Sequence, residues 1–136
     1  MSSAQKIVKI ISFILIALGV LSFVGAGIMA ASTGSAPDDV TKAALAAIAI
    51  MFFVEGFLDI VYAALGIRGA NNPRKIGGFR VLSVFVIAFS VLDVVSAVIN
   101  DPSSLAQPAS FVVYLSLILS VLGFVKSGEI KKLAEK

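Results

Sequence analysis

Long apolar stretches alternate with short polar segments along the chain. The apolar stretches cover about residues 8–31, 43–67, 79–99 and 107–125. Roughly 20 helical residues cross the hydrocarbon core of a bilayer, which is about 30 Å thick. The first three stretches reach that length, and the fourth is short. We therefore predict an all-α fold, a four-transmembrane-helix bundle that forms a single membrane domain over residues 1–136.

Composition supports a membrane protein over a soluble one. The 136 residues are 59% hydrophobic and 14% charged, whereas a soluble domain is about half apolar and about a quarter charged. Buried helices of a soluble protein are the alternative interpretation. Four such helices in succession would leave no amphipathic helix to cover them.

The first apolar stretch has a second interpretation, as a cleaved signal peptide. Lys6 and Lys9 form a basic segment before it, and residues 29–32 faintly resemble a cleavage site. The apolar run is, however, longer than the 7–15 residues usual in signal peptides. We therefore expect this stretch to remain as a helix of the protein.

The basic residues predict the orientation of the chain. Lys6 and Lys9 lie at the start of the chain, and four more basic residues lie around the loop between the second and third stretches. The basic residues near the C-terminus follow the fourth stretch. Lys42 is the exception, because it lies between the first and second stretches. By the positive-inside rule, both termini and the middle loop are cytoplasmic. The loops 32–42 and 100–108 then face outward. We thus expect a multi-pass protein of the cell membrane.

The middle loop is predicted to stop one helix and start a turn. Gly69 suits the left-handed conformation that often ends a helix, and Asn72–Pro73 favours a turn. The simpler role of the basic residues around this loop is to orient the chain. They are also candidates for binding anionic lipid headgroups, at about 1 kcal/mol each; these residues are Arg68, Arg74, Lys75 and Arg80.

Three acidic residues lie inside the apolar stretches. Glu55 and Asp59 are four residues apart, so they share one face of the second helix. Asp93 lies in the third stretch. An ionisable residue at the centre of a spanning helix costs roughly 2.5–3.5 kcal/mol. We therefore expect all three acids to face other helices, a protein interface or a water-filled cavity.

Polar side chains accompany the acids on both helices. Tyr62 continues the face of Glu55 and Asp59, while Ser96 and Asn100 share the face of Asp93. We assign these three to a supporting polar role beside a proton- or cation-binding site.

The acid pair has a restricted charge state. Two carboxylates about 6 Å apart repel each other by about 2.8 kcal/mol at an effective dielectric constant of about 20. Glu55 and Asp59 should therefore share a proton, bind a cation, or meet a basic group of a partner. The alternative is that both are neutral acids whose hydrogen bonds hold helices together.

Small residues predict where helices approach closely. They are Gly19, Ser22, Gly25 and Ala26 in the first stretch, Ala43, Ala46 and Ala47 at the start of the second, and Ser116, Ser120 and Gly123 in the fourth. In lipid, burial of apolar surface does not drive helices to associate. Close packing of helix backbones stabilises their association instead, and small residues permit that packing.

The chain also contains a candidate internal repeat. When residues 12–28 are aligned with residues 83–99, eight of the 17 positions are identical. A duplication would produce two tandem helical hairpins of the same orientation. Chance is the alternative, because few residue types make up both segments.

Catalytic motifs are absent from the sequence. It has no Cys and no His, and no phosphate-binding loop or zinc-ligand spacing. The Gly-x-Gly-Asp signature of intramembrane aspartyl proteases is missing around Asp93. We expect no enzyme activity, no cofactor, no metal site and no nucleic-acid partner.

Two function classes remain. The first is a proton- or cation-linked transporter or channel that works as a homo-oligomer, because four short helices enclose little space. The alternative is a non-catalytic accessory or scaffold protein whose buried acids dock a partner membrane protein.

Overall fold

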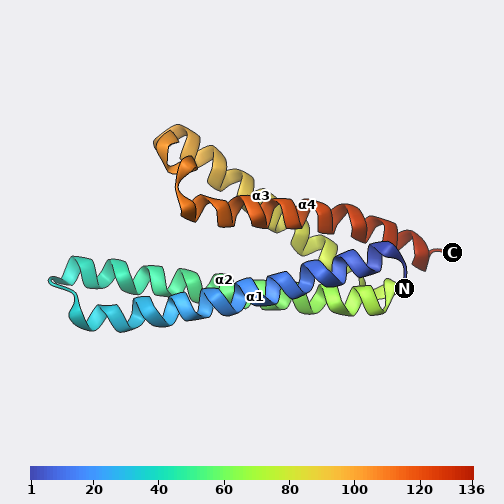
Figure 1. The fold of residues 1–136 in the computed structure, drawn as a ribbon, viewed down its shortest axis with the longest axis horizontal. Coiled ribbons are helices and arrows are strands. Elements are labelled where there is room, and N and C mark those ends of the chain that lie inside the picture. The colour runs from blue at the N-terminus through green and yellow to red at the C-terminus, as the bar shows by residue number, and fades with distance from the viewer. The chain divides into compact units, whose positions relative to one another are not determined.

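The computed structural model describes residues 1–136, with the side chain of Ala109 excepted. Over these residues the chain is 92% helical and contains no strand. The four α-helices are α1 (Ser3–Ser32), α2 (Asp39–Asn71), α3 (Gly77–Asn100) and α4 (Pro108–Ala134) (Figure 1). Short 3₁₀ helices connect them: η1 (Thr33–Ser35), η2 (Pro73–Lys75) and η3 (Pro102–Ala106). The predicted all-α class with four helices is confirmed.

Each of the four helices is long and apolar enough to cross a membrane. The helices are also longer than the apolar stretches. α1 begins at Ser3 rather than near residue 8, and α4 continues to Ala134 rather than ending near residue 125. Apolar side chains mark only the part of a helix suited to hydrocarbon. Beyond it the helix continues because its backbone hydrogen bonds remain favourable there.

Local capping explains where α1 begins. The Ser2 amide donates to Gln5 Oε1 at 2.6 Å, and the Gln5 amide donates to Ser2 Oγ at 3.2 Å. This reciprocal pair satisfies two amide groups that the first turn of a helix would otherwise leave without partners.

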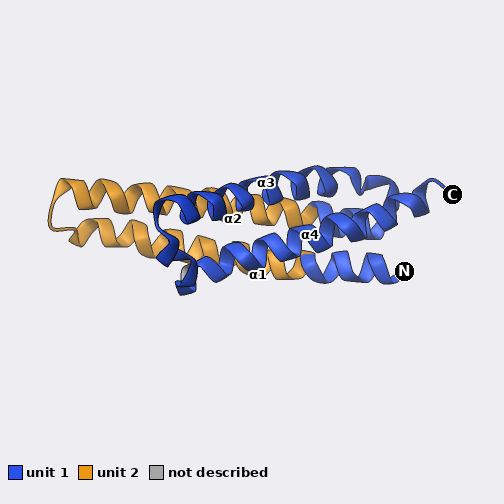
Figure 2. Ribbon diagram, turned by 90° about the horizontal axis from the view of Figure 1, so that it is seen from above, with its two compact units in different colours: residues 1–11, 65–136 blue, residues 12–64 orange. Residues whose placement is uncertain are grey.

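Residues 12–64 form one compact unit, in which α1 and α2 run side by side in opposite directions (orange in Figure 2). Their closest approach is at Gly19 and Gly56: a Cβ atom on Gly56 would lie 2.8 Å from the carbonyl oxygen of Gly19. Gly19 thus belongs to a close-packing face, as predicted from the sequence. Its partner in α2 is Gly56 and not the predicted Ala43, Ala46 or Ala47, which are exposed.

Residues 1–11 and 65–136 form the second compact unit (blue in Figure 2). In it, α3 and α4 form an antiparallel hairpin. Ser120 is fully buried and Gly123 is buried, so both lie on the packed face of α4 that the sequence predicts. Ser116 on the same face is partly exposed.

The start of α1 contacts the end of α2 within this second unit. Gln5 Nε2 donates to the carbonyl oxygen of Ala70 at 2.8 Å, and Lys9 Nζ donates to Asn71 Oδ1 at 3.1 Å. The bond from Gln5 occupies one of the carbonyl groups left free at a helix C-terminus.

The turn between α2 and α3 corrects one prediction. No glycine in the described chain has a positive φ angle, so Gly69 does not take the left-handed conformation predicted for it. Gly69 is a buried residue of α2, and a Cβ atom there would lie 2.8 Å from Ile76 Cα. A glycine is needed at this position for a close backbone approach. The turn predicted at Asn72–Pro73 is present, with Asn72 Oδ1 accepting from the Arg74 amide at 3.2 Å.

Candidate functional site: the acids of the apolar helices

The contact between α1 and α2 determines where the two acids of α2 lie. Gly56 and Ile60 both approach Gly19 of α1. Successive residues of an α-helix are rotated by about 100° around the helix axis. Viewed along the axis of α2, Glu55 therefore lies about 100° from Gly56. Asp59 lies about 60° from Gly56, in the same direction of rotation as Glu55. Both carboxylates therefore flank the surface of α2 that α1 covers. Asp59 is nearer to that surface, and it is partly buried, whereas Glu55 is exposed.

The polar stripe continues along α2 to Tyr62. This side chain is 1% exposed, and it lies on the same side of the helix as Glu55 by the same rotation. The stripe thus passes from the exposed carboxylate of Glu55, through the partly buried Asp59, to a buried phenol.

No basic residue of the same unit lies near this pair. Lys42 is the only Lys or Arg in residues 12–64, and it precedes Glu55 by about 20 Å along the helix axis. Two exposed ion pairs lie on α4, between Lys126 and Glu129 and between Lys131 and Glu135.

Asp93 belongs to the other unit and is exposed on α3. Asn100 Nδ2 donates to the carbonyl oxygen of Ser96 at 2.9 Å and to Ser96 Oγ at 3.2 Å. All three residues are exposed and share one helical face, as predicted. They form a short polar strip in the last two turns of α3, beyond its other polar residues Arg80, Ser83 and Ser90.

The predicted headgroup residues occupy different environments. Arg68 is in the last turn of α2, Arg74 and Lys75 are in η2, and all three are exposed. Arg80 is partly buried, and its guanidinium group lies 4.9 Å from the centre of the Phe124 ring. Its Nε atom is buried and has no hydrogen-bond partner among the described residues. The structure thus separates three exposed cations from one that packs against an aromatic ring.

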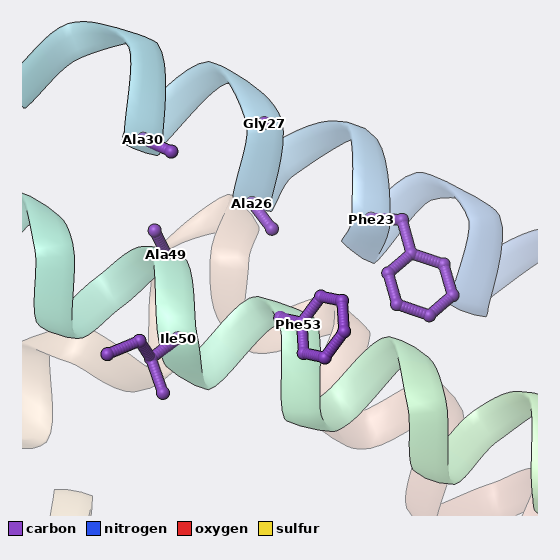
Figure 3. Close-up of a pocket in the computed structure, with 7 residues that line it drawn as sticks. All are labelled: Phe23, Ala26, Gly27, Ala30, Ala49, Ile50 and Phe53. Atoms are coloured by element: carbon purple, nitrogen blue, oxygen red, sulfur yellow. The ribbon is translucent and has the colours of Figure 1, made fainter.

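An open cleft of about 500 Å³ lies between α1 and α2 (Figure 3). It is lined by Phe23, Ala26, Gly27, Ala30, Ala49, Ile50 and Phe53, with the rings of Phe23 and Phe53 packed edge to face at 5.4 Å. Every lining residue is apolar and neither acid contributes to it, so the cleft suits a hydrocarbon group and not a cation. This cleft was not predicted from the sequence, although alanine and glycine recur among the residues that line it.

The described residues contain no group of three or more His, Cys, Asp or Glu side chains placed to hold a metal ion. Comparisons with protein-family models, with curated proteins and with solved structures find no match to this chain.

Proposed function

We propose that this chain is a small integral membrane protein that binds and moves protons or inorganic cations through a carboxylate-bearing interior. The observation that carries the proposal is the Glu55–Asp59 pair, two carboxylates four residues apart on one face of an apolar helix. Repulsion between two such carboxylates, about 2.8 kcal/mol at about 6 Å, favours uptake of one proton or one cation. Asp93 is a third binding group in this proposal.

A homo-oligomer is the assembly that we propose. Glu55 and Asp93 are both exposed on the single chain. In a bilayer, a carboxylate near the centre of a spanning helix costs roughly 2.5–3.5 kcal/mol. Additional copies of the chain would cover these groups and bring several carboxylates to a common path.

In the proposed topology all four helices cross the cell membrane and both termini are cytoplasmic. The arrangement of the basic residues supports this orientation. The proposed duplication of a helical hairpin draws support from one aligned pair, Ser12 and Ser83, because both side chains are fully buried.

Flux into proteoliposomes tests the proposed transport. Glu55→Gln and Asp59→Asn remove the two charges while keeping side chains of the same size. We expect the double variant to lose proton or cation flux while its melting temperature stays close to that of the unmodified protein. Asp39→Asn is the matched control, because this exposed carboxylate lies in the first turn of α2. Unchanged flux in the double variant would exclude transport through this pair.

The accessory or scaffold function is the second candidate. The exposed strip of Asp93, Ser96 and Asn100 favours it, because this strip offers hydrogen bonds to a helix of a partner membrane protein. An accessory protein should be monomeric in mild detergent, show no flux and gain no stability from cations. A homo-oligomer that is stabilised by cations would instead favour transport.

A further inference from the structure

A cleft of about 260 Å³ lies between the η2 turn and the end of α4, within the unit that contains both. Arg74 and Gly77 line it from the turn and the start of α3, and Lys131 and Glu135 line it from α4. The buried Ile76 contributes an apolar wall. This volume leaves room for a phosphate group.

The two cations of the cleft are available to an anion. Arg74 is exposed, and its guanidinium group has no hydrogen bond or ion pair with any other described residue. Lys131 Nζ lies 3.9 Å from Glu135 Oε1, with side-chain exposures of 57% and 63%. An exposed ion pair of this length contributes little free energy, so a stronger anion can take the place of Glu135.

The start of α3 adds to the positive potential. Its N-cap residue is Ile76, no side chain caps the helix, and its first turn carries no acid. Apart from Gly77 itself, its chain neighbours and the adjacent helix backbone, no atom lies within 4 Å of where a Cβ atom of Gly77 would be. The N-terminus of a helix attracts anions through its free amide groups and its dipole. The open space at Gly77 allows an anion to approach these amides.

We propose that this cleft binds a phosphate group through Arg74, Lys131 and the first amides of α3, with Glu135 as the competing anion. The phosphate can belong to an anionic phospholipid headgroup or to a free phosphate ion. The cleft lies where the apolar part of α3 begins, at the depth of the headgroups if this helix crosses the membrane. The site is separate from the acids of the apolar helices, and the proposal does not depend on transport.

Lipid titration of the full chain in mild detergent tests the site. Binding of short-chain phosphatidylglycerol is measured by native mass spectrometry, beside short-chain phosphatidylcholine and inorganic phosphate. Each basic residue near a charged headgroup contributes about 1 kcal/mol, which corresponds to about a fivefold change in Kd. Arg74→Gln and Lys131→Gln should each weaken phosphatidylglycerol binding by about this factor, and Glu135→Gln should strengthen it.

Lys132→Gln is the matched control, because it removes the same charge from the same turn of α4 but does not line the cleft. An equal loss in Lys132→Gln and Lys131→Gln would overturn the proposal, since the attraction would then be diffuse. Unchanged or weaker binding in Glu135→Gln would also overturn it, as would equal affinity for phosphatidylcholine. If inorganic phosphate binds as tightly as phosphatidylglycerol and depends on the same residues, the site stands and its ligand is the free ion.

Discussion

Gly19 and Gly56 bring the backbones of α1 and α2 into direct contact. A Cβ atom on Gly19 would lie 2.9 Å from the carbonyl oxygen of Gly56, and a Cβ atom on Gly56 would lie 2.8 Å from the carbonyl oxygen of Gly19. Because Glu55 adjoins Gly56, this contact also sets the direction of the acid pair relative to α1. Helix packing and the candidate site therefore depend on the same two residues.

Gly56→Ala should destabilise the α1–α2 unit. The added methyl group meets backbone, so the helices must separate, at a cost of about 1–3 kcal/mol. The measurement is the melting temperature in detergent. Gly27→Ala is the matched control, because its new Cβ would meet no atom within 4 Å beyond its chain neighbours and the adjacent helix backbone. Replacement of a helical glycine there should be neutral or stabilising. Equal melting temperatures for the two variants would contradict the close contact.

Gly69→Ala should weaken the turn between α2 and α3. The new Cβ would lie 2.8 Å from Ile76 Cα, a backbone atom that cannot move independently of the turn. We expect a loss of about 1–3 kcal/mol in the free energy of unfolding. Gly77→Ala serves as the comparison, since nothing lies within 4 Å of its added methyl group. If Gly77→Ala proves the more damaging variant, the packing described here is wrong.

Cysteine labelling in whole cells tests the proposed topology. The chain has no Cys, so single-cysteine variants carry no background. Cysteines at Ser35 and Ser104 should react with a reagent that cannot cross the membrane, and a cysteine at Asn72 should not. Labelling of Asn72 with protection of Ser35 would reverse the orientation. Equal labelling of all three positions would indicate that the chain inserts in both directions.

Asp38 should make the start of α2 sensitive to acid. Hydrogen bonds from the Thr41 amide, at 2.7 Å, and from the Thr41 hydroxyl, at 2.9 Å, lower the pKa of Asp38 below its usual value of 3.8. Because the folded pKa is the lower one, the stabilisation is present above pH 3.8 and disappears as the pH falls through the folded pKa.

Amide exchange at Thr41 is the measurement for this cap. Protection of the amide should fall at low pH in the unmodified protein, and Asp38→Asn should remove that pH dependence. Asp39→Asn, which removes the neighbouring carboxylate, should leave the pH dependence of the Thr41 amide unchanged. A Thr41 amide whose protection does not vary with pH would argue against the cap.

The sequence by itself determined the helical class, the number of helices and the positions of the acids along them. Helices that suit a bilayer must carry about 20 apolar residues each. Such a run of apolar residues can be recognised in the sequence without knowledge of the tertiary structure. The pairing of Glu55 with Asp59 on one face follows equally from helical periodicity. Helix ends such as Ala134 could not be read this way, because backbone hydrogen bonding continues where apolar side chains stop.

Only the tertiary structure decided which residues distant in the sequence meet. Gly56 allows close packing of α1 and α2 because Gly19 lies opposite to it. Gly69 allows the close turn after α2 because Ile76 packs against it. Arg74 and Lys131 line the same cleft only because α3 and α4 form a hairpin. The approach of two backbones depends on how whole helices cross, and the local pattern of apolar residues carries no information on the partner at a crossing.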